Sequence, residues 1–327
     1  MQQLNLLLAS LPDGILLGFV YGLAAMGLTL IWGVMNVINL SHGPIIALGM
    51  FGTFFIFSRL GINPYLGLIP VAILGLLLGI LIYTVAVHRV INAPHLSSLL
   101  ATFSVNMIII GLGTALLTTS PYNVDFSAGG FKLGPTTILG TRLIAAVVAM
   151  LFTGGLYLFL YRTRPGKYIR AVANNRAAAE LMGIPSTRIL ALSFGLGTML
   201  AAVSGALIAT FFPFSILAGG SYELKSFVIG VLGGLGNPIG ALFGGLILGI
   251  LDGIIRAFLD TSWVPVIEFA LFVIILLIRP SGLFGAKQWK PGNDITELSS
   301  RYWWSLLWFF FQPLRERLRT AKVRLPS

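Results

Sequence analysis

Charged residues are scarce in this sequence, and cysteine is absent. Only 9% of the 327 residues are Asp, Glu, Lys or Arg, whereas 57% are hydrophobic and the mean hydropathy is +0.93. So few polar groups cannot cover the surface of a soluble globule of this size, so the composition predicts an integral membrane protein. Without cysteine the chain forms neither disulfides nor thiolate metal sites, and three histidines are too few to favour a dedicated zinc site.

The apolar stretches are long and rich in Leu, Ile, Val, Phe and Gly, and they do not alternate with a period of two. This pattern favours membrane-spanning helices over a lipid-facing barrel, so we predict an all-α, polytopic helical membrane protein. The first thirteen residues carry no Lys or Arg, so we expect no cleavable signal peptide. Full-length spans are expected near residues 15–34, 65–87, 97–118, 143–161, 189–211, 239–256 and 264–278.

The basic residues are unevenly placed. Of the 21 Lys and Arg residues, six lie in 162–188 and nine lie in 279–324. Basic clusters beside apolar spans are typical of cytoplasmic segments, so both clusters are predicted to be cytoplasmic. The net charge of +11 does not indicate nucleic-acid binding, because no folded basic domain is available to contact phosphates.

Two shorter apolar pieces, 44–57 and 222–235, decide the topology. If both basic clusters are cytoplasmic, an even number of crossings separates them, yet only three full spans lie between them. A helix of fourteen residues covers about 21 Å of a hydrocarbon core about 30 Å thick. The remainder of the crossing within 212–238 must therefore be a half-helix or extended backbone enclosed by protein, which indicates a transport pathway.

If residues 44–57 also cross, the chain has two sets of four passes joined by the span 143–161. The two sets then run in opposite senses, as in an inverted repeat with broken helices, with nine crossings and the N-terminus outside. The loop 119–142 is then external, and His88 and Arg89 are cytoplasmic. The alternative is that one short piece is re-entrant or interfacial, which leaves seven or eight spans. We therefore expect about 8–9 spans.

Small residues recur every four positions in two of the expected spans. This spacing stacks them on one helix face, where they let backbones approach, and ordinary bundle packing explains it. The turn 233–238 differs, because its glycines and proline interrupt a helix. The small-residue ridges comprise Gly197, Ala201, Gly205 and Ala209, then Gly236, Gly240 and Gly244, followed by Gly245, Gly249 and Gly253.

Four segments, taken in order, carry a family resemblance. They are WGVMNVINLSHG (32–43), NNRAAAELMGI (174–184), VLGGLGNPIGALFGG (231–245) and IRPSGLFG (278–285). Together they resemble the permease subunits of branched-chain amino acid ABC importers, over roughly residues 12–286. The resemblance implies an inverted-repeat ABC importer permease in the bacterial inner membrane.

The resemblance also implies partners. A second permease subunit, identical or different, would complete a dimer that receives substrate from an extracytoplasmic binding protein. ATP and Mg would be bound by two separate cytoplasmic ATPase subunits, so we expect no cofactor and no catalytic residue in this chain. In agreement, the chain lacks a Walker A motif, since Gly166 and Lys167 are followed by Tyr168.

The resemblance places the family's coupling helix, which inserts into the ATPase, on residues 171–183. At helical spacing, the apolar residues of this stretch share one face, Arg170, Arg176 and Glu180 stay solvated, and Gly183 with Pro185 ends the helix. Taken alone, the stretch would be read as a solvated cytoplasmic loop without a partner. The assigned coupling residues are Arg170, Ala171, Asn175, Ala178, Ala179, Glu180, Leu181, Met182 and Gly183.

The substrate pathway is expected where the two broken segments face each other, because polar groups inside a membrane are costly and indicate function. Structural alternatives exist: Asn39 and Ser41 as helix caps, His42 as a structural histidine, and Glu223 as a helix-start residue pairing with Lys225. The pathway candidates are Asn39, Ser41, His42, Gly43, Tyr222, Glu223, Gly233, Gly234, Gly236 and Asn237.

Pro44 stands where the family commonly has an acidic residue, which leaves the substrate open among branched-chain amino acids, other neutral amino acids, and urea or a short amide. An ion-coupled secondary transporter would instead need intramembrane carboxylates, for which Asp252, Asp260 and Glu268 are candidates. An intramembrane enzyme is not favoured, because neither HExxH nor GxSxG occurs.

Two domains are expected. Residues 1–286 form the transmembrane permease domain with its cytoplasmic coupling loop 162–188. Residues 287–327 form a basic, aromatic tail, in which YWWSLLWFFF (302–311) is too short to span the bilayer and is expected to anchor at its interface.

Overall fold

The chain folds into a helical bundle with one small hairpin. The structure, a computed structural model, describes residues 2–117, 119–133, 136–279 and 282–284, all within the compact unit Met1–Ala286. The expected tail, 287–327, lies outside these residues. Eleven α-helices account for most of the described chain, which confirms the prediction of an all-α polytopic protein.

The helices follow one another along the chain with few long connections. Two short turns are also present: the π-helical turn η1 (Tyr83–Val87), which extends α3, and the 3-10 turn η2 (Ile216–Ala218). Strands β1 (Gly130–Leu133) and β2 (Thr136–Leu139) pair antiparallel. The helices are α1 (Gln2–Met35), α2 (His42–Leu60), α3 (Leu68–Ile82), α4 (His95–Leu117), α5 (Gly140–Arg162), α6 (Arg164–Asn174), α7 (Arg176–Leu181), α8 (Ser186–Ile208), α9 (Gly219–Gly233), α10 (Pro238–Phe258) and α11 (Trp263–Ile278).

Seven helices in the described part are long and apolar enough to cross a membrane: α1, α2, α3 with η1, α4, α5, α8 and α10. Helices α9 and α11 are shorter, with 15 and 16 residues. All nine predicted passes therefore coincide with helices. The expected shortness of the pass at 44–57 was wrong, because α2 has 19 residues. Ser58, Arg59 and Leu60 complete its last turn, and Gly61, at φ 65°, ends it.

Glycines allow α1 and α10 to pack closely in opposite directions. Gly14 lies against Gly249, and Gly18 lies against Gly245. A Cβ on any of these four residues would clash with the facing backbone. The predicted small-residue ridge of α10 therefore packs on α1, as ordinary bundle packing requires.

The ridge of α8 lies at the centre of the bundle and serves two neighbours. Gly197 packs against Gly27 of α1, whereas Gly205 packs against the backbone of Ile46 in α2. Together with α1, α8 is the most deeply buried of the span-length helices. These two helices form the core around which the others pack.

Helices α2 and α9 both begin inside the bundle, α2 after the non-helical segment 36–41 and α9 after the segment 209–215 and the turn η2. Their first turns touch, because a Cβ on Gly43 would lie 2.6 Å from the carbonyl oxygen of Gly219, and a Cβ on Gly219 would clash with Gly43 in return. His42 lies against the carbonyl of Ala24, in the middle of α1. The two broken segments therefore face each other, as the sequence predicted.

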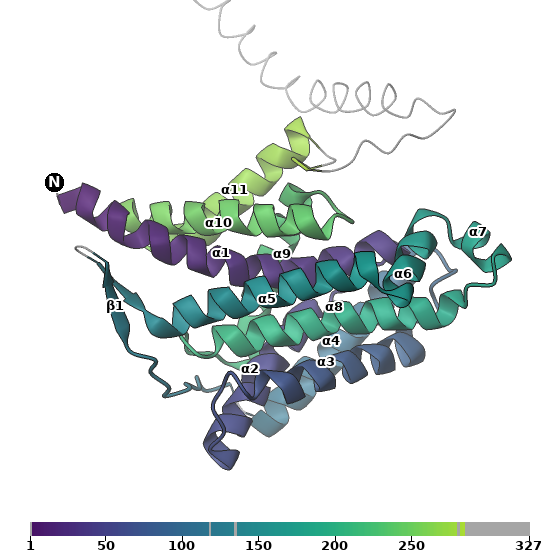
Figure 1. Cartoon of the computed structure of the whole chain (residues 1–327), viewed down its shortest axis with the longest axis horizontal. Coiled ribbons are helices and arrows are strands. Elements are labelled where there is room, and N and C mark those ends of the chain that lie inside the picture. The colour runs from purple at the N-terminus through teal and green to yellow at the C-terminus, as the bar shows by residue number, and fades with distance from the viewer. Residues whose placement is uncertain (1, 118, 134–135, 280–281, 285–327) are drawn as a thin grey trace, which may run out of the picture. The chain divides into compact units, whose positions relative to one another are not determined.

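The ends of the bundle differ in character. Figure 1 shows α6 and α7 at one end, and the β1 hairpin with the beginning of α1 at the other. The basic segment 162–188 and the loop 119–142 thus lie at opposite ends, as the predicted sidedness requires.

Candidate functional site

The expected coupling segment consists of two helices. Asn175 adopts extended backbone angles (φ −158°, ψ 102°) and ends α6, and its side-chain oxygen accepts a hydrogen bond from the Ala178 amide at 3.0 Å. The prediction of one continuous helix over 171–183 was therefore wrong. The physical reason is that Asn is a strong N-cap residue and starts α7 as a new helix.

The end of α7 follows the prediction. Gly183 adopts φ 78°, which an L side chain rarely does, and the Ile184 amide bonds the Ala179 carbonyl at 3.1 Å. Pro185 then precedes α8. Because the chain reverses here, α7 projects from the bundle as a short, closed turn.

Several side chains of this turn reach solvent, and we call three of the apolar ones, Ala178, Leu181 and Met182, the docking tip. Leu181 is 89% exposed and Met182 is 82% exposed. Ala179 is buried against the bundle, and Ala171 lies on α6, so the apolar face predicted across the whole segment is divided. The two large apolar side chains exposed on α7 and its end, Leu181 and Met182, both belong to the docking tip.

Glu180 links the two sides of this turn. Its Oε1 accepts hydrogen bonds from the Ser186 hydroxyl at the start of α8 and from Arg176 Nε at 3.0 Å. Arg176 also donates to the Asn92 side chain at 3.2 Å. The Ser186 hydroxyl and the Arg176 guanidinium hold the pKa of the Glu180 carboxyl below its usual value, so it stays ionised.

Arg170 departs from the prediction that it is solvated. It is half-buried, its Nε donates to the Leu160 carbonyl at 3.1 Å, and its guanidinium lies 4.4 Å from the centroid of the Tyr161 ring. These contacts attach α6 to α5. Arg170 therefore belongs to the packing between these helices.

The first group of pathway candidates lies fully buried where α2 begins. The side-chain oxygen of Asn39 accepts from the Ser41 amide at 3.1 Å and from the Ser41 hydroxyl at 2.6 Å. Ser41 is the N-cap residue of α2, yet its side chain makes no capping hydrogen bond. His42 Nε2 lies 3.0 Å from the Ala24 carbonyl oxygen, so its ring joins α2 to α1.

Glu223 completes this group from the side of α9. It is buried, and a Cβ on Gly43 would lie 2.6 Å from its Oε2 atom, so the carboxylate covers the start of α2. Tyr222 lies beside Tyr21, with ring centroids 6.1 Å apart. Lys225 pairs with other carboxylates, described below, so the suggested pairing with Glu223 does not form. The structure thus brings polar groups of α2 and α9 together.

The second group of pathway candidates lies elsewhere along α1. Gly234 and Gly236 both adopt φ 86°, and Gly236 packs on Gly33. Asn237 caps α10 by accepting from the Gly240 amide at 3.1 Å, with Pro238 in the first turn. Gly33 is nine residues from Ala24, about 13 Å along a helix. The pathway candidates therefore form two separate groups.

A cavity of about 710 Å³ lies between α1, α5, α6 and α10. Gly236 and Asn237 line it, whereas Asn39, Ser41, His42, Gly43 and Glu223 do not. Sequence analysis did not predict that α5 forms a wall, although the paired glycines Gly154 and Gly155 and the tyrosines Tyr157 and Tyr161 lie in that span. The largest lining side chains are Met26, Leu30, Val34, Leu156, Tyr157, Leu160, Tyr161, Ile169, Arg170, Ile239 and Leu242.

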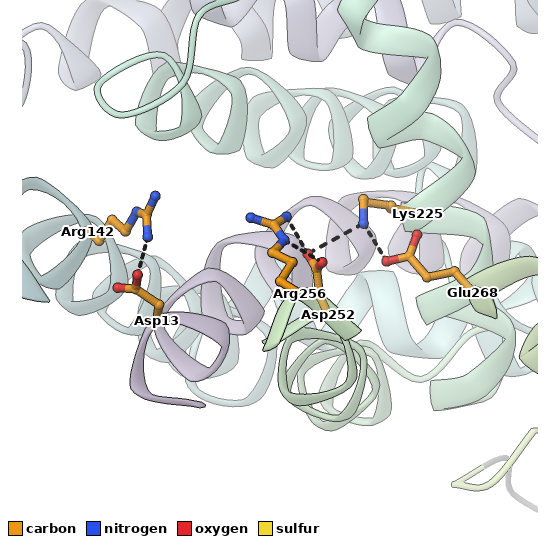
Figure 2. A network of polar contacts seen from close by, with 6 residues as sticks. All are labelled: Asp13, Arg142, Lys225, Asp252, Arg256 and Glu268. Atoms are coloured by element: carbon orange, nitrogen blue, oxygen red, sulfur yellow. Dashed lines mark hydrogen bonds and ion pairs between the residues drawn. The ribbon is translucent and has the colours of Figure 1, made fainter. Parts of the chain in front are cut away.

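Six charged side chains gather between α1, α5 and α9–α11 (Figure 2). Arg256 binds Asp252 through two hydrogen bonds of 2.8 Å, and Lys225 contacts both Asp252, at 3.7 Å, and Glu268. A second pair joins Asp13 of α1 to Arg142 of α5.

Of the three carboxylates considered for ion coupling, Asp252 and Glu268 each have a basic partner. Asp260 lies exposed in the turn before α11. Among the described residues, no group of three His, Asp or Glu side chains could hold a metal ion. The ion pairs of Lys225 join α9 to α10 and α11, so we interpret them as contacts that hold these helices together inside the membrane.

These features define a multi-pass membrane transport subunit: span-length helices, broken helices that meet inside the bundle, and an apolar docking tip outside it. Comparison with known families gives its place. Residues 10–276 match the family described as Branched-chain amino acid transport system / permease component, and the chain belongs to this family.

Individual relatives agree. The chain is 32% identical, over 306 residues, to the high-affinity branched-chain amino acid transport system permease protein LivH of Escherichia coli (strain K12), covering 87% of this chain and 97% of the relative. It is 30% identical over 302 residues to BraD of Pseudomonas aeruginosa, covering 85% and 95%. The ribose import permease RbsC of Escherichia coli (strain K12) is 28% identical over 273 residues, covering 79% and 81%. No solved structure matches the chain significantly.

Proposed function

We propose that this chain is the membrane subunit of an ATP-driven importer in the inner membrane and that it carries neutral amino acids, branched-chain ones first. ATP and Mg bind to two cytoplasmic ATPase subunits. A second permease subunit completes the membrane dimer, and an extracytoplasmic binding protein delivers the substrate. Residues 1–286 form the transporting domain, and 287–327 form an interfacial tail.

The docking tip is the observation that carries the motor-driven mechanism. Leu181 and Met182 are almost fully exposed on a rigid turn at the basic end of the bundle, outside the span-length helices. Apolar side chains held in such a position suit insertion into a groove of a soluble partner. The partner of this chain is therefore an ATPase subunit that grips α7.

The substrate follows from the relatives together with the apolar interior. LivH and BraD are named for branched-chain amino acids, whereas RbsC is named for ribose. The two relatives of higher identity favour an aliphatic amino acid. Urea or a short amide is the second candidate, supported by Pro44, which leaves the start of α2 without the acidic residue common in the family.

The pathway passes the meeting point of α2 and α9. Asn39, Ser41, His42 and Glu223 supply polar groups there, and the backbones of Gly43 and Gly219 close the passage. Because polar groups in such a place are costly, a transport role explains them better than packing does. A secondary transporter is disfavoured, since the candidate carboxylates Asp252 and Glu268 are already paired with bases.

Charge introduced into the docking tip tests this proposal. We expect Ala178→Glu and Leu181→Glu to reduce uptake roughly tenfold or more, because burying an unpaired carboxylate in an apolar groove costs several kcal/mol. Both sites are exposed, so the variants should still reach the membrane. The conservative variant Leu181→Met keeps the apolar bulk and should transport normally. Uptake of labelled leucine and co-purification of the ATPase are the measurements; normal uptake by both charged variants contradicts the proposal.

A further inference from the structure

The cavity between α1, α5, α6 and α10 reaches from α6 to the middle of the bundle. Along α1 it extends from Val34 to Met26, and along α5 from Tyr161 to Thr153. Its volume of about 710 Å³ lies in the range of small-molecule sites, about 300–1,000 Å³. It is therefore large enough for an amino acid with several waters.

The lining changes character along its length. Leucine, valine and methionine side chains of α1, α5 and α10 form the long walls, and the Thr153 hydroxyl lies at the inner end. Tyr157, Tyr161, Arg170 and Asn174 gather toward the α6 end. Apolar walls with a few polar groups suit a ligand that has an aliphatic side chain and a small polar head.

The inner end of the cavity lies at the depth of the contact between α2 and α9, with α1 between them. Thr153 Oγ1 lies 3.5 Å from the sulfur of Met26, and Met26 is two residues from Ala24, whose carbonyl contacts His42. Two residues span about 3 Å along a helix but turn about 200° around it, so the inner end of the cavity and His42 lie at similar depth on opposite faces of α1.

Helix α6 lies between the cavity and α7. Ile169, Arg170 and Asn174 of α6 form part of its wall, and Asn174 directly precedes Asn175, where α7 begins. A force applied to α7 therefore acts next to the cavity.

We propose that this cavity binds a neutral amino acid with an aliphatic side chain, between the contact of α2 with α9 and the end of the bundle that carries α6 and α7. The inference rests on the proposed function, and it assigns Met26, Thr153, Gly154, Tyr157 and Leu242 to the substrate site.

Two adjacent glycines of α5 provide a matched test. Gly154 lines this cavity, whereas Gly155 lines a separate groove against α8, and a Cβ on either meets no atom within 4 Å. Gly154→Leu places a side chain in the cavity from a position where the Cβ has free space, and Gly155→Leu adds the same side chain outside the cavity. We expect Gly154→Leu to lower leucine uptake roughly tenfold or more, and Gly155→Leu to change it less than about twofold.

Substrate size separates a binding role from a structural one. In the series Gly154→Ala, Gly154→Val and Gly154→Leu, uptake of leucine should fall before uptake of alanine, so the leucine-to-alanine ratio decreases. Damage to folding lowers both substrates equally. An unchanged ratio, or equal effects at Gly154 and Gly155, overturns the proposal and indicates that lipid or the second permease occupies the cavity.

A second measurement covers the case in which Gly154→Leu fails to reach the membrane. Because the chain has no cysteine, Thr153→Cys introduces a single thiol into the cavity, and Phe152→Cys introduces one into the groove that Gly155 lines. In the assembled transporter, leucine should slow labelling of Thr153→Cys and leave Phe152→Cys unchanged. Absence of protection at Thr153→Cys contradicts the proposal.

The failures are distinguishable. If the docking-tip variants stop uptake but the Gly154 series and the thiol are insensitive to substrate, the motor-driven permease stands and the substrate site lies elsewhere. If the docking-tip variants transport normally, the proposed function fails, whatever the cavity shows.

Discussion

Glu180 has the most specific set of contacts in the docking segment. Its carboxylate accepts hydrogen bonds from Arg176 of α7 and from Ser186 at the beginning of α8. Arg176 in turn donates to Asn92 in the connection between α3 and α4. Without these hydrogen bonds, the six residues of α7 would be held mainly by their chain connections, through the non-helical residues Asn175 and Gly183. The carboxylate therefore makes α7 and α8 one mechanical unit.

Removing this carboxylate should separate ATP hydrolysis from transport. We expect Glu180→Ala to keep the ATPase bound and hydrolysing, because the docking tip is intact, but to import several-fold less leucine per ATP. Ser186→Ala removes one of the two links and should give an intermediate ratio. The measurement is uptake and phosphate release in vesicles that contain the full transporter; an unchanged ratio in both variants contradicts this role.

The pKa direction fixes the pH dependence of the same link. A carboxyl whose pKa is lowered on folding is stabilising above its unfolded pKa, and the stabilisation is lost as pH falls through the lowered value. The import-to-hydrolysis ratio should therefore stay constant between about pH 6 and about pH 8 and decrease only in acid.

Close packing of α8 on α2 requires that Gly205 has no side chain. At Gly205 a Cβ would overlap the carbonyl of Ile46, whereas at Gly111 of α4 a Cβ meets nothing within 4 Å. Gly205→Leu should therefore separate α2 from α8 at a cost of about 1–3 kcal/mol or more. Gly111→Leu is the matched control.

The thermal stability of the detergent-solubilised protein measures this difference. We expect a lower unfolding temperature for Gly205→Leu and no change for Gly111→Leu. Equal unfolding temperatures would show that the α2–α8 contact is soft.

At this scale, sequence predicts the helices well and their relations less well. Apolar runs give the nine spans and four-residue glycine spacing gives the ridges, because both are local periodicities. The break at Asn175 was missed because an Ala-rich stretch favours one helix, and the capping bond is visible only in three dimensions. The cavity is formed by four helices, and the ion pairs of Lys225 with Asp252 and Glu268 join three. Neither feature can be predicted from a local sequence pattern, because each depends on how separate helices pack.

The whole molecule is organised by the difference between its two ends. Six basic residues lie in 162–188 around α6 and α7, whereas the loop 119–142 at the other end holds one acid and two bases. The positive-inside rule predicts that the basic end is cytoplasmic, which assigns every helix its direction across the membrane.

Single thiols report this orientation directly. In a chain without native cysteine, Met182→Cys should react with a membrane-impermeant reagent only from the cytoplasmic side, because this position is 82% exposed at the basic end. Asp125→Cys, in the exposed loop at the other end, should react only from outside. Labelling of both from the same side would exclude the predicted topology and, with it, the motor on α7.

The backbones of Gly43 and Gly219 meet directly, with the Glu223 side chain beside them, and we expect this contact to act as a pivot. Two backbone segments in direct contact can rotate or slide against each other with little steric resistance, yet they leave a void as soon as they part. Rotation of α2 against α9 therefore costs little free energy, whereas separation of the two helices costs much more. The contact between Gly43 and Gly219 would then limit leakage of solute between transport cycles, whether or not the ATPase is hydrolysing ATP.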